Sequence, residues 1–267
     1  MKLIAAAFIL FLGFSSFVTA EEPHPHSLML SQTHEFQSSI LEEDITILIG
    51  LPFNYQPESM TYPIVFHTDG DVMFSMGTEI LRLMSFERSA PPVISVGVSY
   101  GGFPEWLAAR ARDYHPSASD PNKEGVAKFL RVLEEEVIPF VRENYATSEN
   151  GHVLYGHSSG GLLALYAALS ESTSFDFILA SSPSVEEEPE WIEQLLHEAG
   201  ADTAKAIFIS LGEAETKTRP LLDSFVNELS AKSARNNIRY VIIPDMPHMA
   251  VIPPAYAAGM KYLFGVE

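Results

Sequence analysis

The sequence has no cysteine, few basic residues and, beyond residues 3–12, no long apolar run. Without cysteine the chain forms no disulfide, has no thiol nucleophile and cannot hold a lipid on cysteine. Lys and Arg number 16 against 35 Asp and Glu, so the formal net charge is −19 at pH 7. Because so acidic a surface repels phosphate backbones and anionic lipids, we expect neither nucleic acid nor a membrane surface as a partner.

Residues 1–20 have the character of a secretory signal peptide. Lys2 precedes the apolar run 3–12, and small residues close the segment at Val18-Thr19-Ala20. We therefore expect cleavage after residue 20, a secreted or periplasmic protein, and no stable membrane insertion once the leader is removed. A mobile N-terminal segment over 21–34 and a single domain over 35–267 are expected to follow. The sequence does not indicate an oligomeric state.

The rest of the chain is typical of an α/β protein, since short apolar runs alternate with amphipathic stretches of helical length. An early antiparallel hairpin followed by βα units predicts a doubly wound, mainly parallel sheet, with ligands at the carboxyl ends of its strands. The predicted strands are 45–52, 63–67, 92–98, 152–156, 176–181, 206–211 and 238–243. The predicted helices are 77–88, 124–138, 160–172, 187–199, 219–232 and 254–264.

The pattern G-x-S-x-G occurs at Gly156 to Gly160, between a predicted strand and a predicted helix. In the α/β-hydrolase fold this pattern forms a sharp strand-to-helix turn that presents a serine nucleophile. The glycines are needed because side chains two residues before and after the serine would collide. We therefore expect Ser158 to be the nucleophile and the N–H of Ser159 to stabilise an oxyanion. His157 is interpreted as a packing residue of the turn that points away from the catalytic base.

The catalytic base is expected among the histidines that follow Ser158, because the triad order in this fold is nucleophile, acid, histidine. Two histidines qualify, His197 and His248. His197 lies in a predicted helix of acidic and apolar residues, which is typical of a surface position. His248 follows the last predicted strand in a loop, so we assign the base to His248.

The acid of the triad is expected in the loop that follows strand 206–211. Two carboxylates occur there, Glu213 and Glu215. Either could accept the imidazole N–H and so hold the productive tautomer of the base.

Several segments resemble the "Putative esterase" (esterase D-like) family of α/β-hydrolases. Residues 62–71 read Y-P-I-V-F-H-T-D-G-D and resemble the family segment Y-P-V-L-Y-L-L-D-G-D; 96–100 and 110–116 resemble V-G-I-x-Y and R-x-R-D-Y-T-P. The resemblance is strongest to the periplasmic siderophore (enterobactin-type) esterase branch. It implies a serine esterase that hydrolyses a small-molecule carboxylic ester and needs no metal or organic cofactor.

The resemblance also implies roles for particular residues. It places the second oxyanion N–H on Asp71 or Gly70. The family's acid often follows the strand as glycine, two residues and then the acid, which favours Glu215 over the runner-up Glu213 and over Asp223 in the next helix.

Arg110 and Arg112 are candidates for binding an anionic or catecholate substrate. A structural ion pair with Asp113 is an equal alternative.

Two further functions fit the same motifs. The acyl group could be transferred to a sugar or lipid alcohol instead of water, which product analysis with an added acceptor alcohol would reveal. The chain could also be a non-catalytic binding protein on the same fold. A fluorophosphonate probe, which reacts with an activated serine, would leave such a protein unlabelled.

Overall fold

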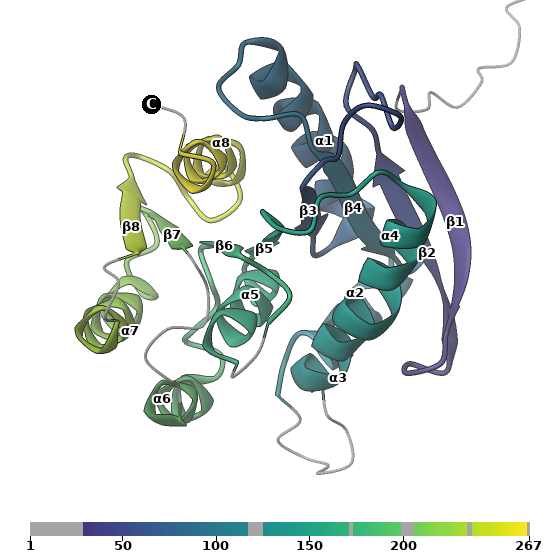
Figure 1. Cartoon of the computed structure of the whole chain (residues 1–267). Coiled ribbons are helices and arrows are strands. Elements are labelled where there is room, and N and C mark those ends of the chain that lie inside the picture. Colours follow the sequence, from purple (N-terminus) through teal and green to yellow (C-terminus); the bar gives the residue numbers. More distant parts are fainter. Residues whose placement is uncertain (1–28, 117–124, 171–172, 199–205, 234–236, 266–267) are drawn as a thin grey trace, which may run out of the picture.

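The computed structural model describes residues 29–116, 125–170, 173–198, 206–233 and 237–265 (Figure 1). The expected signal peptide and most of the expected mobile segment lie outside the described residues. Within these ranges, no helix combines the length and the apolar character needed to cross a membrane.

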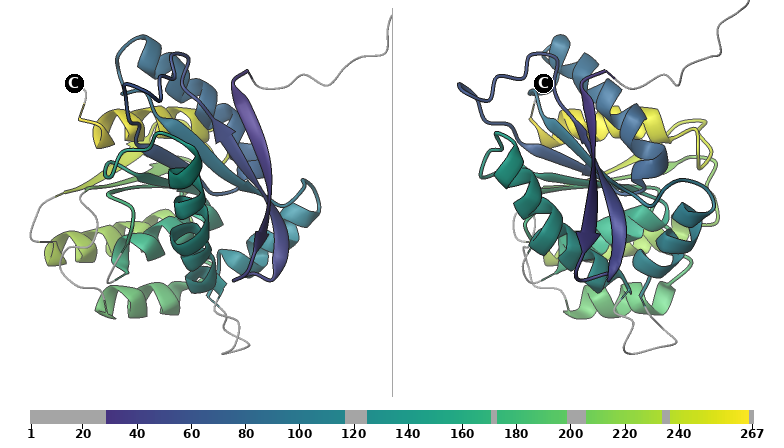
Figure 2. Two further views of the ribbon diagram at one scale, coloured as in Figure 1. Left: turned by 45° about the vertical axis from the view of Figure 1, so that its right-hand side comes forward. Right: turned by 90° about the vertical axis from the view of Figure 1, so that its right-hand side faces the viewer.

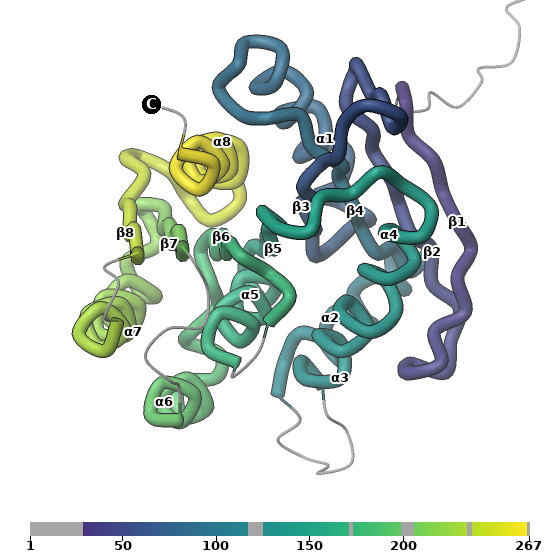
Figure 3. Tube along the Cα trace, viewed as in Figure 1, coloured from purple at the N-terminus to yellow at the C-terminus, as the bar shows by residue number. Residues whose placement is uncertain are grey.

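The strands form one eight-stranded sheet in the order β1-β2-β4-β3-β5-β6-β7-β8, which Figure 3 shows as a continuous row across the molecule. β1 pairs antiparallel with β2, and β2 antiparallel with β4. All pairs from β4 to β8 are parallel. The predicted hairpin and mainly parallel sheet are thus confirmed. The strands are β1 (Ser31–Ser38), β2 (Glu43–Gly50), β3 (Ile64–His67), β4 (Ile94–Ser99), β5 (Val153–His157), β6 (Phe177–Ser181), β7 (Ala206–Gly212) and β8 (Ile238–Ile243).

Helices cover both faces of the sheet, as Figure 2 shows. α1 (Gly70–Phe86) and α8 (Ile252–Leu263) pack on one face and enclose the smaller apolar core. The other face holds the larger core. Its helices are α3 (Gly125–Arg131), the π-helical turn η1 (Val132–Val137), α4 (Ile138–Asn144), α5 (Ser159–Leu169), α6 (Pro189–Glu198) and α7 (Arg219–Lys232). α2 (Glu105–Asp113) lies beside α3.

Four elements differ from the sequence-based expectation. In place of the predicted helix 124–138, the chain forms α3, the π-helical turn η1 and then α4, which ends at Asn144. A hairpin was expected, but β1 was not among the predicted strands, because seven of its eight residues are polar and it has no alternating apolar pattern. α1 begins at Gly70 rather than at residue 77, since Asp69 in the left-handed conformation lets the helix start directly after β3. α2 was missed because four of its nine residues are charged and its sequence has little apolar periodicity.

Candidate active site

The turn after β5 has the geometry of a nucleophile elbow. Ser158 has φ 60° and ψ −123°, a conformation that a non-glycine residue rarely adopts. Its N–H donates to the Ser181 carbonyl at 3.0 Å. A Cβ added to Gly156 would lie 1.9 Å from the carbonyl oxygen of Gly160, so only glycine fits there. The steric requirement inferred from the motif is therefore present in the fold.

Ser158 Oγ opens into a pocket of about 360 Å³ that also contains His248. Within the described residues, its hydrogen bond goes to Ser184 Oγ at 3.0 Å and not to His248. The Ser184 N–H in turn donates to the Ser158 carbonyl at 3.2 Å. Catalytic hydrogen bonds are often long or misaligned before substrate binds. The remaining lining residues are Glu186, Glu187, Ala214, Glu215, Thr216, Lys217 and Thr218.

His248 is paired with Glu215 at the ends of β8 and β7. Nδ1 of the imidazole lies 2.5 Å from Glu215 Oε2. The other carboxylate oxygen accepts hydrogen bonds from Ser182 Oγ at 2.6 Å and from the Gly212 N–H at 2.8 Å. Burial by itself raises the pKa of Glu215, but the hydrogen bonds from His248, Ser182 and Gly212 outweigh it and lower the pKa below its ordinary value. Glu215 is thus held as a carboxylate.

The other residues considered for the acid and the base make different contacts. Glu213 Oε2 accepts the Asp245 N–H at 2.9 Å. Asp223 accepts the Tyr240 hydroxyl at 2.9 Å. His197 is exposed on α6. Of the three carboxylates considered from sequence, the structure brings Glu215 to His248.

His157 differs from the expectation that it points away from the base. Its ring lies 4.6 Å from that of His248, measured between centroids, at an angle of 44°. Burial, and then the neighbouring His248, lower the pKa of His157 to about 3, so its imidazole is neutral. The expectation was wrong because the contact joins the end of β5 to the loop after β8, and local sequence gives no signal of a contact between such distant segments.

The loop after β3 presents backbone donors at the same edge of the sheet. Within the described residues, no protein acceptor takes the N–H of Gly70, Asp71 or Ser159. A Cβ on Gly70 would lie 2.4 Å from the Val98 carbonyl oxygen, so glycine is required for this loop to pack on β4.

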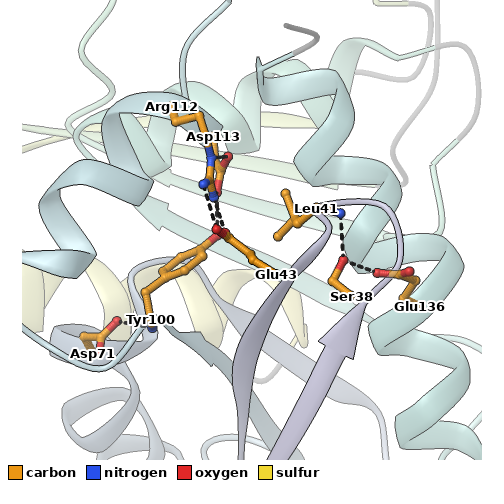
Figure 4. A network of polar contacts seen from close by, with 8 residues as sticks. All are labelled: Ser38, Leu41, Glu43, Asp71, Tyr100, Arg112, Asp113 and Glu136. Atoms are coloured by element: carbon orange, nitrogen blue, oxygen red, sulfur yellow. Dashed lines mark hydrogen bonds and ion pairs between the residues drawn. The ribbon is translucent and has the colours of Figure 1, made fainter.

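The Asp71 carboxylate holds the chain that follows β4. It accepts the Tyr100 N–H at 3.0 Å (Figure 4). It also accepts the Ser99 hydroxyl at 2.6 Å and the Gly102 N–H at 2.8 Å. The Tyr100 hydroxyl continues the network to Asp113 at 2.6 Å. The Asp71 side chain therefore anchors its own backbone to the neighbouring loop.

The two arginines of α2 have different surroundings. Arg112 pairs with Asp113 at 2.6 Å and with Glu43 of β2, away from the pocket (Figure 4). Arg110 Nε donates to Asp69 at 2.7 Å, and its terminal nitrogens reach the elbow. Neither arginine is among the residues that line the pocket around Ser158.

Sequence reasoning assigned no role to Ser182 and Ser184, although both contact proposed catalytic groups. The available signal was their position directly after β6, at the edge of the sheet where ligands bind. Ser158 lines a pocket at a strand–helix turn, beside an imidazole–carboxylate pair and near backbone N–H groups that have no protein acceptor among the described residues. These are the parts of an acyl-transfer site.

Comparison with known proteins agrees with an acyl-transfer enzyme. The family model "Putative esterase" matches residues 38–241, and the chain belongs to this family. The siderophore triacetylfusarinine C esterase of Aspergillus fumigatus is 32% identical over 210 residues, covering 71% of this chain and 70% of the relative. The ferri-bacillibactin esterase BesA of Bacillus subtilis is 23% identical over 231 residues, covering 77% and 80%.

A solved structure shares the fold. The siderophore hydrolase EstA of Aspergillus nidulans superposes with a TM-score of 0.78 at 22% identity, covering 92% of this chain and 98% of that chain. The resemblance to siderophore esterases is thus confirmed, and the protein is a carboxylic ester hydrolase.

Proposed function

We propose that the protein hydrolyses a siderophore-type ester through an acyl-enzyme on Ser158. The observation that supports this most directly is the His248 Nδ1 to Glu215 Oε2 contact beside Ser158 in one pocket. The pair leaves Nε2 of His248 free to act as the base.

In the first half of the reaction, Ser158 Oγ bonds to the ester carbonyl carbon while His248 Nε2 takes the hydroxyl proton. For this step the Ser158 hydroxyl turns from Ser184 toward His248. The negative charge on the carbonyl oxygen rests on the N–H groups of Ser159 and of Asp71 or Gly70. The bond to the alcohol oxygen then breaks, and His248 returns the proton to the leaving alcohol.

In the second half, water repeats the same steps and releases the acid. His248 deprotonates the water as its oxygen bonds to the acyl carbon, and the proton then returns to Ser158 Oγ. Glu215 stays ionised throughout and stabilises the imidazolium that forms in each half. These residues complete the cycle with no further group.

The substrate class is proposed from the relatives, whose names state siderophore esters as their substrates. The pocket around Ser158 is open to solvent, which leaves room for a bulky ester. Glu186, Glu187 and Glu215 line the pocket against one lysine, Lys217, so we expect neutral substrates to be accepted more readily than anionic ones.

Export is a part of the same proposal. Residues 1–20 act as a signal peptide, and residues 35–267 form the catalytic domain. The N-terminal sequence of protein recovered from the secreted or periplasmic fraction tests it, because an intact Met1 there would contradict cleavage.

The catalytic proposal is tested with Ser158→Ala and His248→Ala, assayed on p-nitrophenyl acetate and on a trilactone siderophore. Loss of a triad serine typically lowers turnover on the order of 10⁶-fold. His197→Ala is the matched control and should retain normal rates. Substantial turnover by Ser158→Ala, or no fluorophosphonate labelling of the unaltered protein, would refute the assignment.

A further inference from the structure

One face of α2 surrounds Asp69. Trp106 and Arg110 are four residues apart on α2, and Tyr114, the residue that directly follows the helix, continues the same spacing, so their side chains lie along the same side. The Trp106 indole N–H donates to Asp69 Oδ1 at 2.9 Å, and Arg110 Nε donates to the same oxygen at 2.7 Å. The Asp69 N–H donates to the Tyr114 hydroxyl at 2.8 Å. Backbone and side chain of Asp69 are thus both held by α2.

Asp69 occupies a position that needs such support. It is 1% exposed and has φ 57° and ψ 48°, the left-handed region that a non-glycine residue occupies at a cost. It directly precedes Gly70 and Asp71, whose N–H groups have no protein acceptor in the part of the chain that the structure describes. A shift of Asp69 would therefore displace one half of the proposed oxyanion hole.

Arg110 also contacts the nucleophile elbow, which supplies the other half of the proposed oxyanion hole. Its Nη1 donates to Ser159 Oγ at 2.9 Å, and its Nη2 donates to the His157 carbonyl at 3.2 Å. These two residues flank the nucleophile on either side. All three guanidinium nitrogens therefore bond within the protein, and the side chain is only 18% exposed.

We propose that Arg110 is a positioning residue whose guanidinium fixes the loop after β3 against the nucleophile elbow and so sets the spacing of the oxyanion donors. This inference rests on the proposed function of Ser158, because it concerns the geometry of that reaction. It differs from a substrate-binding role, since it involves no contact between Arg110 and the substrate.

The structure also indicates which substitution is informative. Alanine would leave the Asp69 carboxylate buried beside no counter-charge, which is strongly destabilising. Lysine keeps the positive charge near Asp69, but its single ammonium cannot reproduce the flat fork that reaches Asp69, Ser159 and His157 together. Arg110→Lys therefore removes the bridge while retaining the ion pair.

The test compares Arg110→Lys with Arg131→Lys, a control in which the arginine lies on α3 and pairs with Glu135 at 2.9 Å. Both are assayed on a neutral ester, p-nitrophenyl acetate, and on an anionic ester, p-nitrophenyl hemisuccinate. Misplacing a donor by about 1 Å typically costs on the order of 10²-fold in rate. We expect Arg110→Lys to lower kcat by about 10- to 10²-fold on both esters with KM changed less than about twofold, and Arg131→Lys to leave both constants unchanged.

A second variant shows whether the effect passes through Asp69. Asp69→Asn and Arg110→Lys should each lower kcat, and the double variant should lose less than the product of the two losses, because both break the same bridge. Arg110→Lys alone decides the outcome if Asp69→Asn does not fold.

Normal kcat in Arg110→Lys would overturn the inference. A rise in KM confined to the anionic ester would also overturn it, in favour of direct substrate binding. Ser158→Ala distinguishes failure of the positioning role from failure of the proposed function. If Ser158→Ala is inactive while Arg110→Lys is normal, only the positioning role of Arg110 fails. An active Ser158→Ala would refute the proposed function itself.

Discussion

We predict that replacing Glu215 by glutamine holds the His248 imidazole in the wrong tautomer for the proposed reaction. Glu215 Oε1 accepts two hydrogen bonds, from Ser182 Oγ and from the Gly212 N–H. An amide at this position has one oxygen and one NH₂ group, and the Gly212 N–H requires an acceptor. The amide oxygen should therefore occupy the Oε1 position, which turns the NH₂ group toward His248.

That orientation reverses the hydrogen bond to the imidazole. In the unaltered protein, His248 Nδ1 donates to Glu215 Oε2 and Nε2 is left as a proton acceptor. With an NH₂ group opposite it, Nδ1 has to accept, so the imidazole proton moves to Nε2. An Nε2 that already holds a proton cannot take the one from Ser158.

The expected fall in kcat has two causes. The productive tautomer of His248 is lost, and so is the negative charge that stabilises the imidazolium. In chymotrypsin-like proteases, the corresponding acid-to-amide change lowers kcat about 10⁴-fold. At about 1.36 kcal/mol for each factor of ten, this is roughly 5.5 kcal/mol of transition-state stabilisation. We expect a loss of about 10³- to 10⁴-fold in kcat for Glu215→Gln.

The assay is initial-rate hydrolysis of p-nitrophenyl acetate, with the melting temperature measured to establish folding. Glu213→Gln is the matched control, because Glu213 accepts the Asp245 N–H and does not contact His248. It should stay within a few-fold of normal. A folded Glu215→Gln enzyme with near-normal kcat would refute the reasoning and indicate that Ser158 and His248 act without an acid.

Two more predictions concern groups that sequence reasoning left without a role. Ser184→Ala removes the hydrogen-bond partner that lies 3.0 Å from Ser158 Oγ, so we expect the rate of fluorophosphonate labelling to change by up to about tenfold. Ser170→Ala is the control. An unchanged labelling rate in Ser184→Ala would show that the contact has no part in the reaction. Burial lowers the pKa of His67 from 6.5 to about 4. Between pH 4 and pH 6.5 the unfolded chain therefore binds more protons at this residue than the folded chain, so stability should fall as the pH drops below 6.5. The His67 ring is hydrogen-bonded to the Tyr256 hydroxyl at 2.7 Å, so the test replaces both residues by phenylalanine. In urea unfolding, the stability lost between pH 7 and pH 5 should be up to about 2 kcal/mol smaller in this double variant than in the unaltered protein, and equal losses would contradict the prediction.

Much of the fold and part of the site could be predicted because their signals are local. The strands of the parallel sheet are buried on both faces and read as short apolar runs. The elbow is defined by a steric requirement within five residues, from Gly156 to Gly160. His248 could be proposed from chain order and from its loop after the last strand. The strands and the elbow need only neighbouring residues, so the sequence by itself determined them, whereas the role of His248 stays a prediction.

The tertiary structure decided which side chains meet. Glu213 and Glu215 both follow β7, and only the path of the loop after β8 shows that Glu215 lies opposite His248. The contact of His157 with His248 and the bridge made by Arg110 likewise join segments that are distant in sequence. Such contacts depend on the twist of the sheet and on the angle at which each helix packs, and no local pattern of residues encodes either.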